Sequence, residues 1–247
     1  MTLKNLWDIF TDKYSLSIFH PQYFVKRYEN SGVKLAEIYA KGIVVDIGCG
    51  RMPYKKRLGH IKKYIGVDSP VTSKWYNSQN KPDIIADATH IPLQDKSCDT
   101  ILSLQVLEHL PDPQEALNEM KRLLKRNGIL ILSTVQTYPL HDDPYDYYRF
   151  TKFGLKKILT KAGFRIIRHE EQGNIFVLLC QALNIFLMLQ LKNMIAQNRS
   201  KYLAVFLLPL ILLTTTFLNL LTLPLSHVEK KSKFRIVQTL VAKKVTP

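Results

Sequence analysis

A strand-forming run that ends in two glycines constrains the fold of this chain more than any other stretch. Residues 43–47 are apolar except for Asp46, and Gly48 and Gly50 follow with one residue between them. A short apolar run of this kind is typical of a buried strand in a parallel sheet. Glycines directly after such a strand permit a tight turn and let a ligand approach the backbone closely. The stretch therefore predicts a ligand site at the end of a central strand.

Strand and helix patterns alternate from this turn to residue 168. Further apolar strands are expected at 64–67, 83–86, 100–104, 128–135 and 164–168. Strands that alternate with helices predict an α/β fold with a parallel sheet and right-handed crossovers.

Two helices between these strands have clear end signals. Asp112 is an N-cap residue, and Glu115 completes a capping box. We expect this helix to end at Asn127 and Gly128. A second helix is expected between Thr151, as its cap, and Gly163.

Acidic and polar residues follow successive strands of the predicted sheet. Asp68 ends the second strand, Asp87 and Ala88 follow the third, and Gln105 follows the fourth. The carboxyl ends of parallel strands form the usual ligand site of an open sheet. Each residue alone is weak support, because aspartates also cap helices and glycine turns are common. In this order they suit an adenosine compound: Asp68 for ribose hydroxyls, Asp87 for adenine, and Asp46 for a cationic amino group.

These residues resemble a known family, the class I S-adenosylmethionine-dependent methyltransferases, and within it the large group that contains small-molecule methyltransferases. The resemblance is carried, in order along the chain, by VVDIGCG, YIGVDSP, IIADATHIPL and DTILSLQVLEHLPDP. It covers residues 42–168 and the last strand. Pro53, which stands where a dinucleotide-binding fingerprint has its third glycine, argues against an NAD protein, as does Asp46.

The resemblance implies a Rossmann-like, seven-stranded sheet that is mostly parallel, with the last strand antiparallel. Two apolar runs of this sequence, described below, predict a helical hairpin inserted before that strand. It also implies S-adenosyl-L-methionine as the cofactor and in-line displacement at its methyl group. The residues expected to bind the cofactor are Asp46, Gly48 and Gly50 for the amino-acid part, Asp68 for the ribose, Asp87 and Ala88 for the adenine, and Gln105 beside the sulfonium.

The loop at residues 137–151, after the fifth strand, is the most unusual polar stretch. We expect His141 to act as general base on an acceptor hydroxyl, with His109 as a second candidate. The residues expected to shape the acceptor pocket are Tyr145, Tyr147, Tyr148 and Arg149. The alternative is a surface loop whose tyrosines pack on a neighbouring helix, with His109 in a structural hydrogen bond. The segment PYDYYRFT also resembles one in bacterial methyltransferases associated with surface-glycan assembly.

The chain of 247 residues carries 35 Lys and Arg against 20 Asp and Glu, a formal net charge of +15. Such a charge suits nucleic acid, anionic lipid or an acidic substrate. Residues 103–106 lack the Asn/Asp-Pro-Pro-aromatic motif of nucleic-acid amino-methyltransferases, so nucleic acid ranks below a small-molecule or lipid-linked acceptor. Three widely spaced cysteines predict neither a disulfide framework nor a zinc site, and no metal site is expected. No secretion signal is recognised, which favours the cytoplasm.

Two uncharged apolar runs lie at 175–191 and 202–225. The longer would form a helix of about 36 Å, enough for a bilayer core of about 30 Å. Pro209 is expected to interrupt it. If the last strand rejoins the sheet, the insertion must cross a membrane twice or not at all. We favour a re-entrant or in-plane hairpin at an anionic leaflet over a helical pair buried against the domain or in a dimer interface. The basic residues expected to contact that leaflet are Lys192, Arg199, Lys201, Lys230, Lys231 and Lys233.

The predicted organisation is a helical lid at 1–41, a methyltransferase core at 42–173, the apolar insertion at 174–231 and the last strand at 232–247. The predicted function is methyl transfer to an oxygen of a lipid-linked, glycan or amphipathic acceptor at the inner face of the membrane. The alternatives are a soluble small-molecule or RNA methyltransferase, and a membrane-bound scaffold that binds the cofactor without turnover.

Overall fold

The computed structural model describes residues 16–75, 81–196, 201–229 and 232–245. The chain divides into two compact units, one of Glu29–Glu171 with Val237–Pro247 and one of Met1–Tyr28 with Gln172–Ile236. The first contains the sheet and the second contains two long helices, and we describe each by itself. The division expected at residues 41, 173 and 231 stays a prediction.

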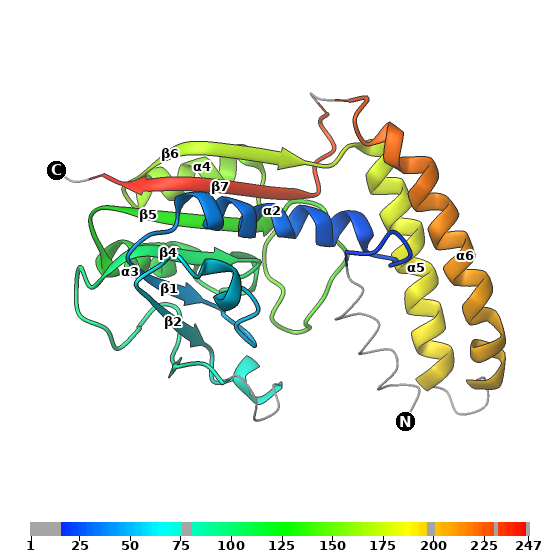
Figure 1. The fold of residues 1–247 in the computed structure, drawn as a ribbon, viewed down its shortest axis with the longest axis horizontal. Helices are drawn as coiled ribbons and strands as arrows, with labels where there is room; N and C mark the ends of the chain where they lie inside the picture. Colours follow the sequence, from blue (N-terminus) through cyan, green and yellow to red (C-terminus); the bar gives the residue numbers. More distant parts are fainter. Residues whose placement is uncertain (1–15, 76–80, 197–200, 230–231, 246–247) are drawn as a thin grey trace. The chain divides into compact units, whose positions relative to one another are not determined.

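A seven-stranded sheet forms the framework of the first unit (Figure 1). Its strand order is β3-β2-β1-β4-β5-β7-β6. The strands are β1 Ile43–Ile47, β2 Lys63–Asp68, β3 Ile84–Ile85, β4 Cys98–Leu104, β5 Leu124–Val135, β6 Phe164–Gln172 and β7 Val237–Lys244. The pairs from β3 to β5 are parallel, whereas β7 runs antiparallel to β5. The predicted fold class, with a helical hairpin before the last strand, is confirmed.

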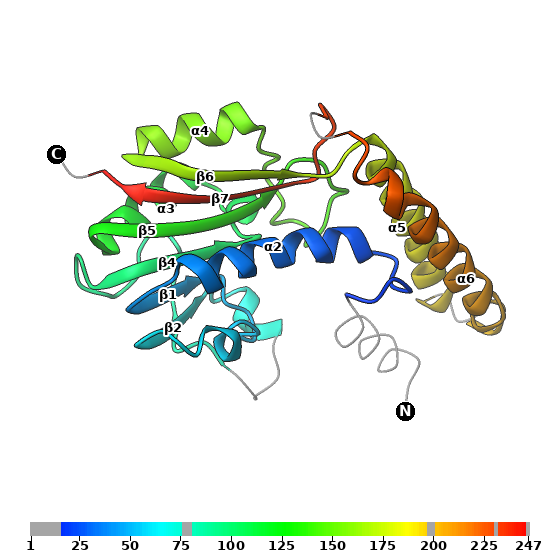
Figure 2. The same cartoon turned by 45° about the horizontal axis from the view of Figure 1, so that its top comes forward.

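Helices cover both faces of this sheet (Figure 2). On one face, α3 (Pro113–Leu123) and α4 (Lys152–Lys161) bury Leu117 and Leu155 in one apolar cluster. On the other face, the part of α2 (Tyr23–Tyr39) from Glu29 onward packs Ala36 into a second cluster. Strand β1 contributes to both clusters, because successive side chains of a strand point to opposite faces. The central strand is therefore buried on both sides, as its apolar sequence predicts.

The helix after β4 begins as predicted and ends earlier than predicted. Asp112 caps α3, and its side chain accepts a hydrogen bond of 2.9 Å from the backbone N–H of Glu115. The expected end at Asn127 is wrong, because β5 already begins at Leu124, which pairs with Cys98 of β4. The register between β4 and β5 shifts between Cys98 and Thr100, and Asn127 takes a φ of 63°. The Asn-Gly pair thus lies in an irregularity of the strand.

The second unit contains α5 (Ile175–Ala196) and α6 (Lys201–Leu225), which lie side by side (Figures 1 and 2). Both are long and apolar enough to cross a membrane by length and composition. The expected interruption at Pro209 is wrong, because α6 runs through this residue. Proline removes one backbone donor but has a φ compatible with a helix, so a helix can continue through it with a local distortion.

Candidate functional site

A cavity of about 310 Å³ lies in the first unit, beyond the carboxyl ends of β1, β2 and β4. Eight of the sequence-predicted site residues line it: Gly48, Asp68, Asp87, Ala88, Gln105, His109, Tyr145 and Tyr147. The other five predicted residues, Asp46, Gly50, His141, Tyr148 and Arg149, are not among its lining residues.

The glycine turn after β1 brings bare backbone to this cavity. Gly48 has a φ of +72°, and a Cβ at this position would clash with the side chain of Val106. Gly50 has a φ of +52° and donates its backbone N–H to Oδ2 of Asp68 at 2.8 Å. A side chain at either glycine would strain the turn. Gly48 therefore forms part of the cavity wall, and Gly50 acts on the cavity through Asp68.

Asp68, at the end of β2, has a firmly fixed carboxylate. Besides the bond from Gly50, its Oδ1 accepts the backbone N–H of Ser69 at 2.7 Å and the hydroxyl of Thr72. The residue is 5% exposed and lines the cavity. Such a carboxylate is well placed to accept hydrogen bonds from two neighbouring hydroxyl groups, as on a ribose.

Asp87 and Ala88 lie one strand further along the same edge. Oδ1 of Asp87 accepts bonds of 2.8 and 2.7 Å from the backbone N–H and the hydroxyl of Thr89. No described residue donates to Oδ2, which leaves that oxygen available to an amino group such as that of adenine. Ala88 is buried beside it and adds an apolar wall.

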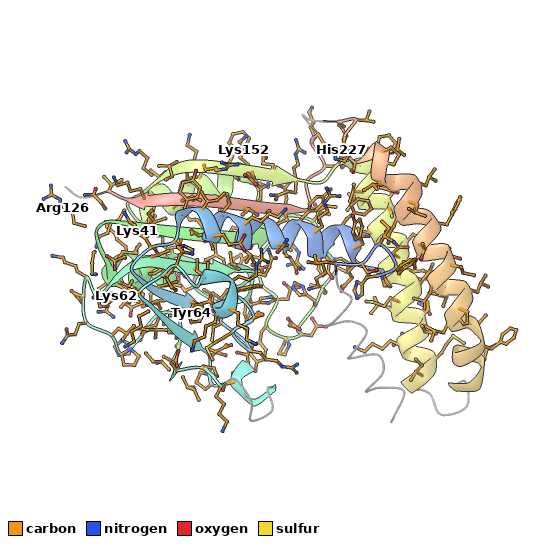
Figure 3. The ribbon with its side chains drawn as sticks, viewed as in Figure 1. Lys41, Lys62, Tyr64, Arg126, Lys152 and His227 are labelled. Carbon is orange, nitrogen blue, oxygen red and sulfur yellow. The ribbon has the colours of Figure 1, made fainter. Side chains whose placement is uncertain are left out.

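Asp46 lies behind the cavity in the body of the sheet. It is 1% exposed, and its carboxylate accepts the hydroxyl of Tyr64, a residue of β2 (Figure 3). Burial raises the pKa of Asp46 to about 7; the bond from Tyr64 lowers it and the charge of Asp68 raises it further. A cation near this carboxylate would favour its charged form. The geometry thus suits a supporting electrostatic role for Asp46 beneath the cavity.

Gln105 marks the end of β4 and has a φ of 57°, a left-handed conformation that is uncommon outside glycine. Its backbone N–H donates to the carbonyl of Ser133, and its Nε2 donates to Ser133 Oγ, both at 2.9 Å. These two bonds to β5 hold a strained residue at the cavity edge.

His109 closes the short helix η3 (Leu107–His109) and lines the cavity. Its Nδ1 lies 2.7 Å from the backbone carbonyl of Tyr145. A carbonyl can only accept, so the hydrogen bond assigns the proton to Nδ1 and leaves the lone pair on Nε2. The expected structural hydrogen bond and a position in the cavity thus occur together.

His141 lies next to His109, with 4.7 Å between the ring centroids. Its backbone N–H donates to Oδ2 of Asp146 at 3.0 Å, and its Nδ1 is 3.2 Å from the same oxygen. The carboxylate of Asp146 therefore orients the imidazole ring of His141. The ring contacts His109, which lines the cavity, but does not line the cavity itself.

Arg149 makes its hydrogen bonds within the loop that follows β5. It forms a two-pronged ion pair with Asp146, with distances of 2.5 and 2.6 Å, and donates to the carbonyls of Tyr138 and Pro139. The hydrogen bonds from Arg149 hold the pKa of Asp146 well below its usual range. Tyr148 is not among the lining residues, and its hydroxyl donates to the carbonyl of Pro111, which does line the cavity, at 3.0 Å. Of the four predicted acceptor residues, Tyr145 and Tyr147 reach the cavity wall.

Two residues near the cavity were not singled out from the sequence. Glu108 is fully buried, its Oε2 accepts the hydroxyl of Thr134 at 2.7 Å, and burial raises its pKa. Asp142 lines the cavity, with Oδ2 4.0 Å from Nε2 of His109. The sequence offered one signal for each residue. Glu108 directly precedes His109 in LEHL, and Asp142 directly follows His141.

Comparisons with known proteins bear on the fold and the class of protein. The family model described as "Methyltransferase domain" matches residues 45–132. A curated protein of Mycolicibacterium smegmatis, named "Probable S-adenosylmethionine-dependent methyltransferase", is 26% identical over 156 residues, covering 58% of this chain and 60% of the relative. The chain thus matches only part of the length of this relative.

Solved structures share the fold. The cyclase SpnF has a TM-score of 0.56 at 19% identity, covering 89% of this chain and 81% of that chain. Phosphoethanolamine N-methyltransferase 2 of Haemonchus contortus, in complex with S-adenosyl-L-methionine, has a TM-score of 0.52 at 16% identity, covering 97% and 60%. At such identities the likeness shows the fold alone.

The sequence match and the cavity support one assignment. Gly48, Asp68 and Asp87, which were expected to contact the amino-acid part, the ribose and the adenine of S-adenosyl-L-methionine, all line this cavity. This cofactor was predicted from the order of the motifs, and the relatives confirm it. Residues 45–132 match the methyltransferase-domain family, and over a longer stretch the chain is similar to S-adenosylmethionine-dependent methyltransferases of class I fold.

Proposed function

We propose that this protein transfers a methyl group to an oxygen atom of a lipid-linked, glycan or amphipathic acceptor at the cytoplasmic membrane surface. The observation that carries the transfer is that His109, Tyr145 and Tyr147 line the same cavity as Asp68 and Asp87. Cofactor-binding and proton-accepting groups thus face one space.

One side of the cavity would bind the cofactor, and the other side would bind the acceptor and remove its proton. Bound S-adenosyl-L-methionine supplies an activated methyl group, so the protein has to align the acceptor and remove its proton. Asp68 and Asp87 hold the nucleoside side. On the other side, Nε2 of His109 has a free lone pair and can accept the proton of a hydroxyl. His141 supports this role by its contact with His109, and Tyr145 and Tyr147 bound the acceptor space.

A radiolabel assay tests the reaction. The purified full chain is incubated with methyl-labelled cofactor and a membrane extract, and the label is traced to lipid, small-molecule and RNA fractions. We expect label in the lipid or glycan fraction, and His109→Ala should lower turnover roughly 100-fold or more. His60→Ala, at a histidine bonded to the carbonyl of Ala40, is the control. Label in RNA would favour the RNA alternative, and cofactor binding without any label would favour the scaffold.

The membrane part of the proposal is supported by the polar interior of the second unit. Asn184 donates to Oδ1 of Asn219 at 3.0 Å, which joins α5 to α6. Asn219 in turn donates to the carbonyls of Ile18 and His20, and Gln181 donates to that of Pro21. Asparagine and glutamine are favoured between helices where lipid surrounds them.

The outward faces of the same helices are apolar. On α5 the exposed apolar residues are Phe176, Leu179, Leu183, Phe186 and Leu189, and on α6 they are Leu203, Phe206, Leu210, Leu213, Phe217, Leu220 and Leu221. Apart from the adjacent pair Leu220 and Leu221, they recur every three or four residues, so each set forms a stripe along its helix. The helices thus have polar side chains between them and apolar side chains on their exposed faces. A water-soluble helical pair has the opposite arrangement, so this one favours contact with lipid.

Basic residues suit an anionic leaflet as the partner. Lys192 and Lys233 are exposed. Of the other expected contacts, Arg199, Lys230 and Lys231 lie outside the described residues, and so does the side chain of Lys201. Each lysine or arginine near an anionic surface adds about 1 kcal/mol of attraction.

Vesicle flotation tests this part separately. The full chain should float with vesicles that contain phosphatidylglycerol. Leu213→Lys/Phe217→Lys should lower the bound fraction at least tenfold, because a lysine inside a bilayer costs about 2.5 kcal/mol or more. The matched control Phe153→Lys/Ile167→Lys places two lysines at exposed apolar positions of the first unit. A wild-type protein that stays soluble without detergent and ignores vesicles would contradict membrane association.

A further inference from the structure

Three metal-ligating side chains converge where the β4 turn meets the loop after β5. One carboxylate oxygen of Glu108 and one ring nitrogen each of His109 and His141 all lie within 4.8 Å of one another. Glu108 and His109 belong to η3, whereas His141 comes from the loop. Ligand atoms that bind one ion at about 2.0–2.2 Å lie at most about 4.4 Å apart, so a small inward shift of these side chains would let a single ion contact all three.

The carboxylate of Glu108 points to a missing positive partner. The side chain is fully buried, and Oε2 is bonded to Thr134. Oε1 has no hydrogen-bond partner among the described residues. A buried carboxylate oxygen without a partner is costly, and native structures normally satisfy it. A cation at this point would supply what the protein groups do not.

Both histidines are already oriented as ligands. The Nδ1 of His109 faces the carbonyl of Tyr145 at 2.7 Å, and the Nδ1 of His141 faces the carboxylate of Asp146 at 3.2 Å. Each acceptor fixes the proton on Nδ1 and leaves the lone pair of Nε2 for a ligand. Metal-binding histidines characteristically donate their second nitrogen to a carbonyl or carboxylate in this way. Arg149, which clamps Asp146, extends that support.

We propose that Glu108, His109 and His141 bind a divalent transition-metal ion at the acceptor side of the cavity. Two imidazoles and one carboxylate favour zinc, manganese, iron or cobalt over magnesium or calcium. Three protein ligands leave coordination positions open, and Asp142, 4.0 Å from His109, is near enough to complete the set. The sequence expectation of no metal rested on the cysteines, and this site uses none.

The role of the ion rests on the proposed function, whereas its binding does not. Since His109 and Asp142 line the cavity, the ion would stand beside the acceptor. It would select acceptors with two neighbouring oxygens, such as adjacent sugar hydroxyls, and lower the pKa of the one it contacts. That oxygen forms a bond to the methyl carbon as the methyl–sulfur bond breaks, the bonding pair stays on sulfur, and the hydroxyl proton passes to water. When the ion is bound, the Nε2 lone pair of His109 is used in coordination, so the ion replaces His109 in activating the hydroxyl; without the ion, His109 keeps the role of base given above.

Cobalt titration of the chelator-stripped full chain tests the site without any acceptor. We expect one Co²⁺ per chain, seen by its visible absorption, and displacement by Zn²⁺. His141→Ala and Glu108→Gln should each weaken binding by at least about tenfold. His227→Ala, at an exposed histidine after α6, should leave binding unchanged (Figure 3). Equal Co²⁺ affinity in the wild type and in both ligand variants would overturn the proposal.

Two further measurements separate folding and function from metal binding. Affinity for S-adenosyl-L-homocysteine should stay within about threefold of the wild type in His141→Ala, since His141 does not line the cavity. A loss of this affinity would mark a folding defect in His141→Ala. In that case the Co²⁺ affinity of Glu108→Gln tests the metal site. If the stripped protein transfers methyl groups at the full rate, the role of the ion is refuted while the proposed function stands. If no transfer is found but Co²⁺ binds as described, the site stands and the function fails.

Discussion

Asp68→Ala is expected to weaken binding of S-adenosyl-L-homocysteine by at least about 100-fold. The carboxylate is placed to accept two hydroxyl groups of the ligand, and a hydrogen bond to a charged group contributes about 1.5–3 kcal/mol. Two such bonds amount to about 3 kcal/mol or more. The same carboxylate also holds the backbone N–H groups of Gly50 and Ser69. Its removal therefore takes away a ligand contact and loosens the glycine turn together.

Isothermal titration calorimetry of the full chain measures this effect. Asp68→Asn keeps one carbonyl oxygen and should fall between the wild type and Asp68→Ala. Asp95→Ala is the matched control, because its carboxylate is 69% exposed and forms a surface ion pair with Arg122. Such a pair contributes at most about 1 kcal/mol to stability and nothing to the cavity. An affinity within about threefold of the wild type in Asp68→Ala would contradict the assigned cofactor site.

Asp46 is expected to make the free energy of unfolding fall as the pH rises from about 4 to about 7. Burial raises the pKa of Asp46 from 3.8 to about 7 in the folded protein. Between these values the folded state holds a proton that the unfolded state has released, so raising the pH favours unfolding. The contribution is complete below about pH 3.8 and is lost as the pH passes about 7. A pKa difference of this size corresponds to at most about 4 kcal/mol.

Chemical denaturation of the cofactor-free protein between pH 4.5 and pH 8 checks this prediction. Asp46→Asn has no titrating group at this position, yet its amide oxygen can still accept the hydroxyl of Tyr64. The difference in unfolding free energy between wild type and Asp46→Asn should change by roughly 2–3 kcal/mol across the range. Asp95→Asn, at an exposed site, should show the wild-type profile. Parallel profiles for the wild type and Asp46→Asn would show that Asp46 does not titrate there.

The sequence predicted those parts of the fold that depend on local patterns. The apolar run at 43–47 formed β1, and the cap at Asp112 formed as expected, because a cap involves residues three apart. The end of α3 was misplaced because β5 begins at Leu124, where pairing with Cys98 overrides the local stop signal. A contact between residues so far apart along the chain leaves no periodic pattern.

The same distinction applies to the site. Gly48, Asp68 and Asp87 lie at a strand end or within two residues of one, so the sheet places them at the cavity. Loop side chains depend on partners that the sequence does not name. Arg149 turns to Asp146, and the loop is tied to η3 by the carbonyl of Glu108, which accepts two backbone N–H groups. Glu108 itself was overlooked because a buried acid and a solvated acid look alike in sequence.

The place of β7 has a consequence for how the protein is made. In space β7 lies between β5 and β6, but in the chain α5 and α6 come between β6 and β7. A ribosome therefore synthesises the entire helical hairpin before the strand that joins β5 to β6. Until then β6 is an unpaired edge strand, and such edges invite wrong partners. Synthesis of the hairpin thus precedes closure of the sheet, and a chain that ended before Val237 would lack the strand that links β5 to β6.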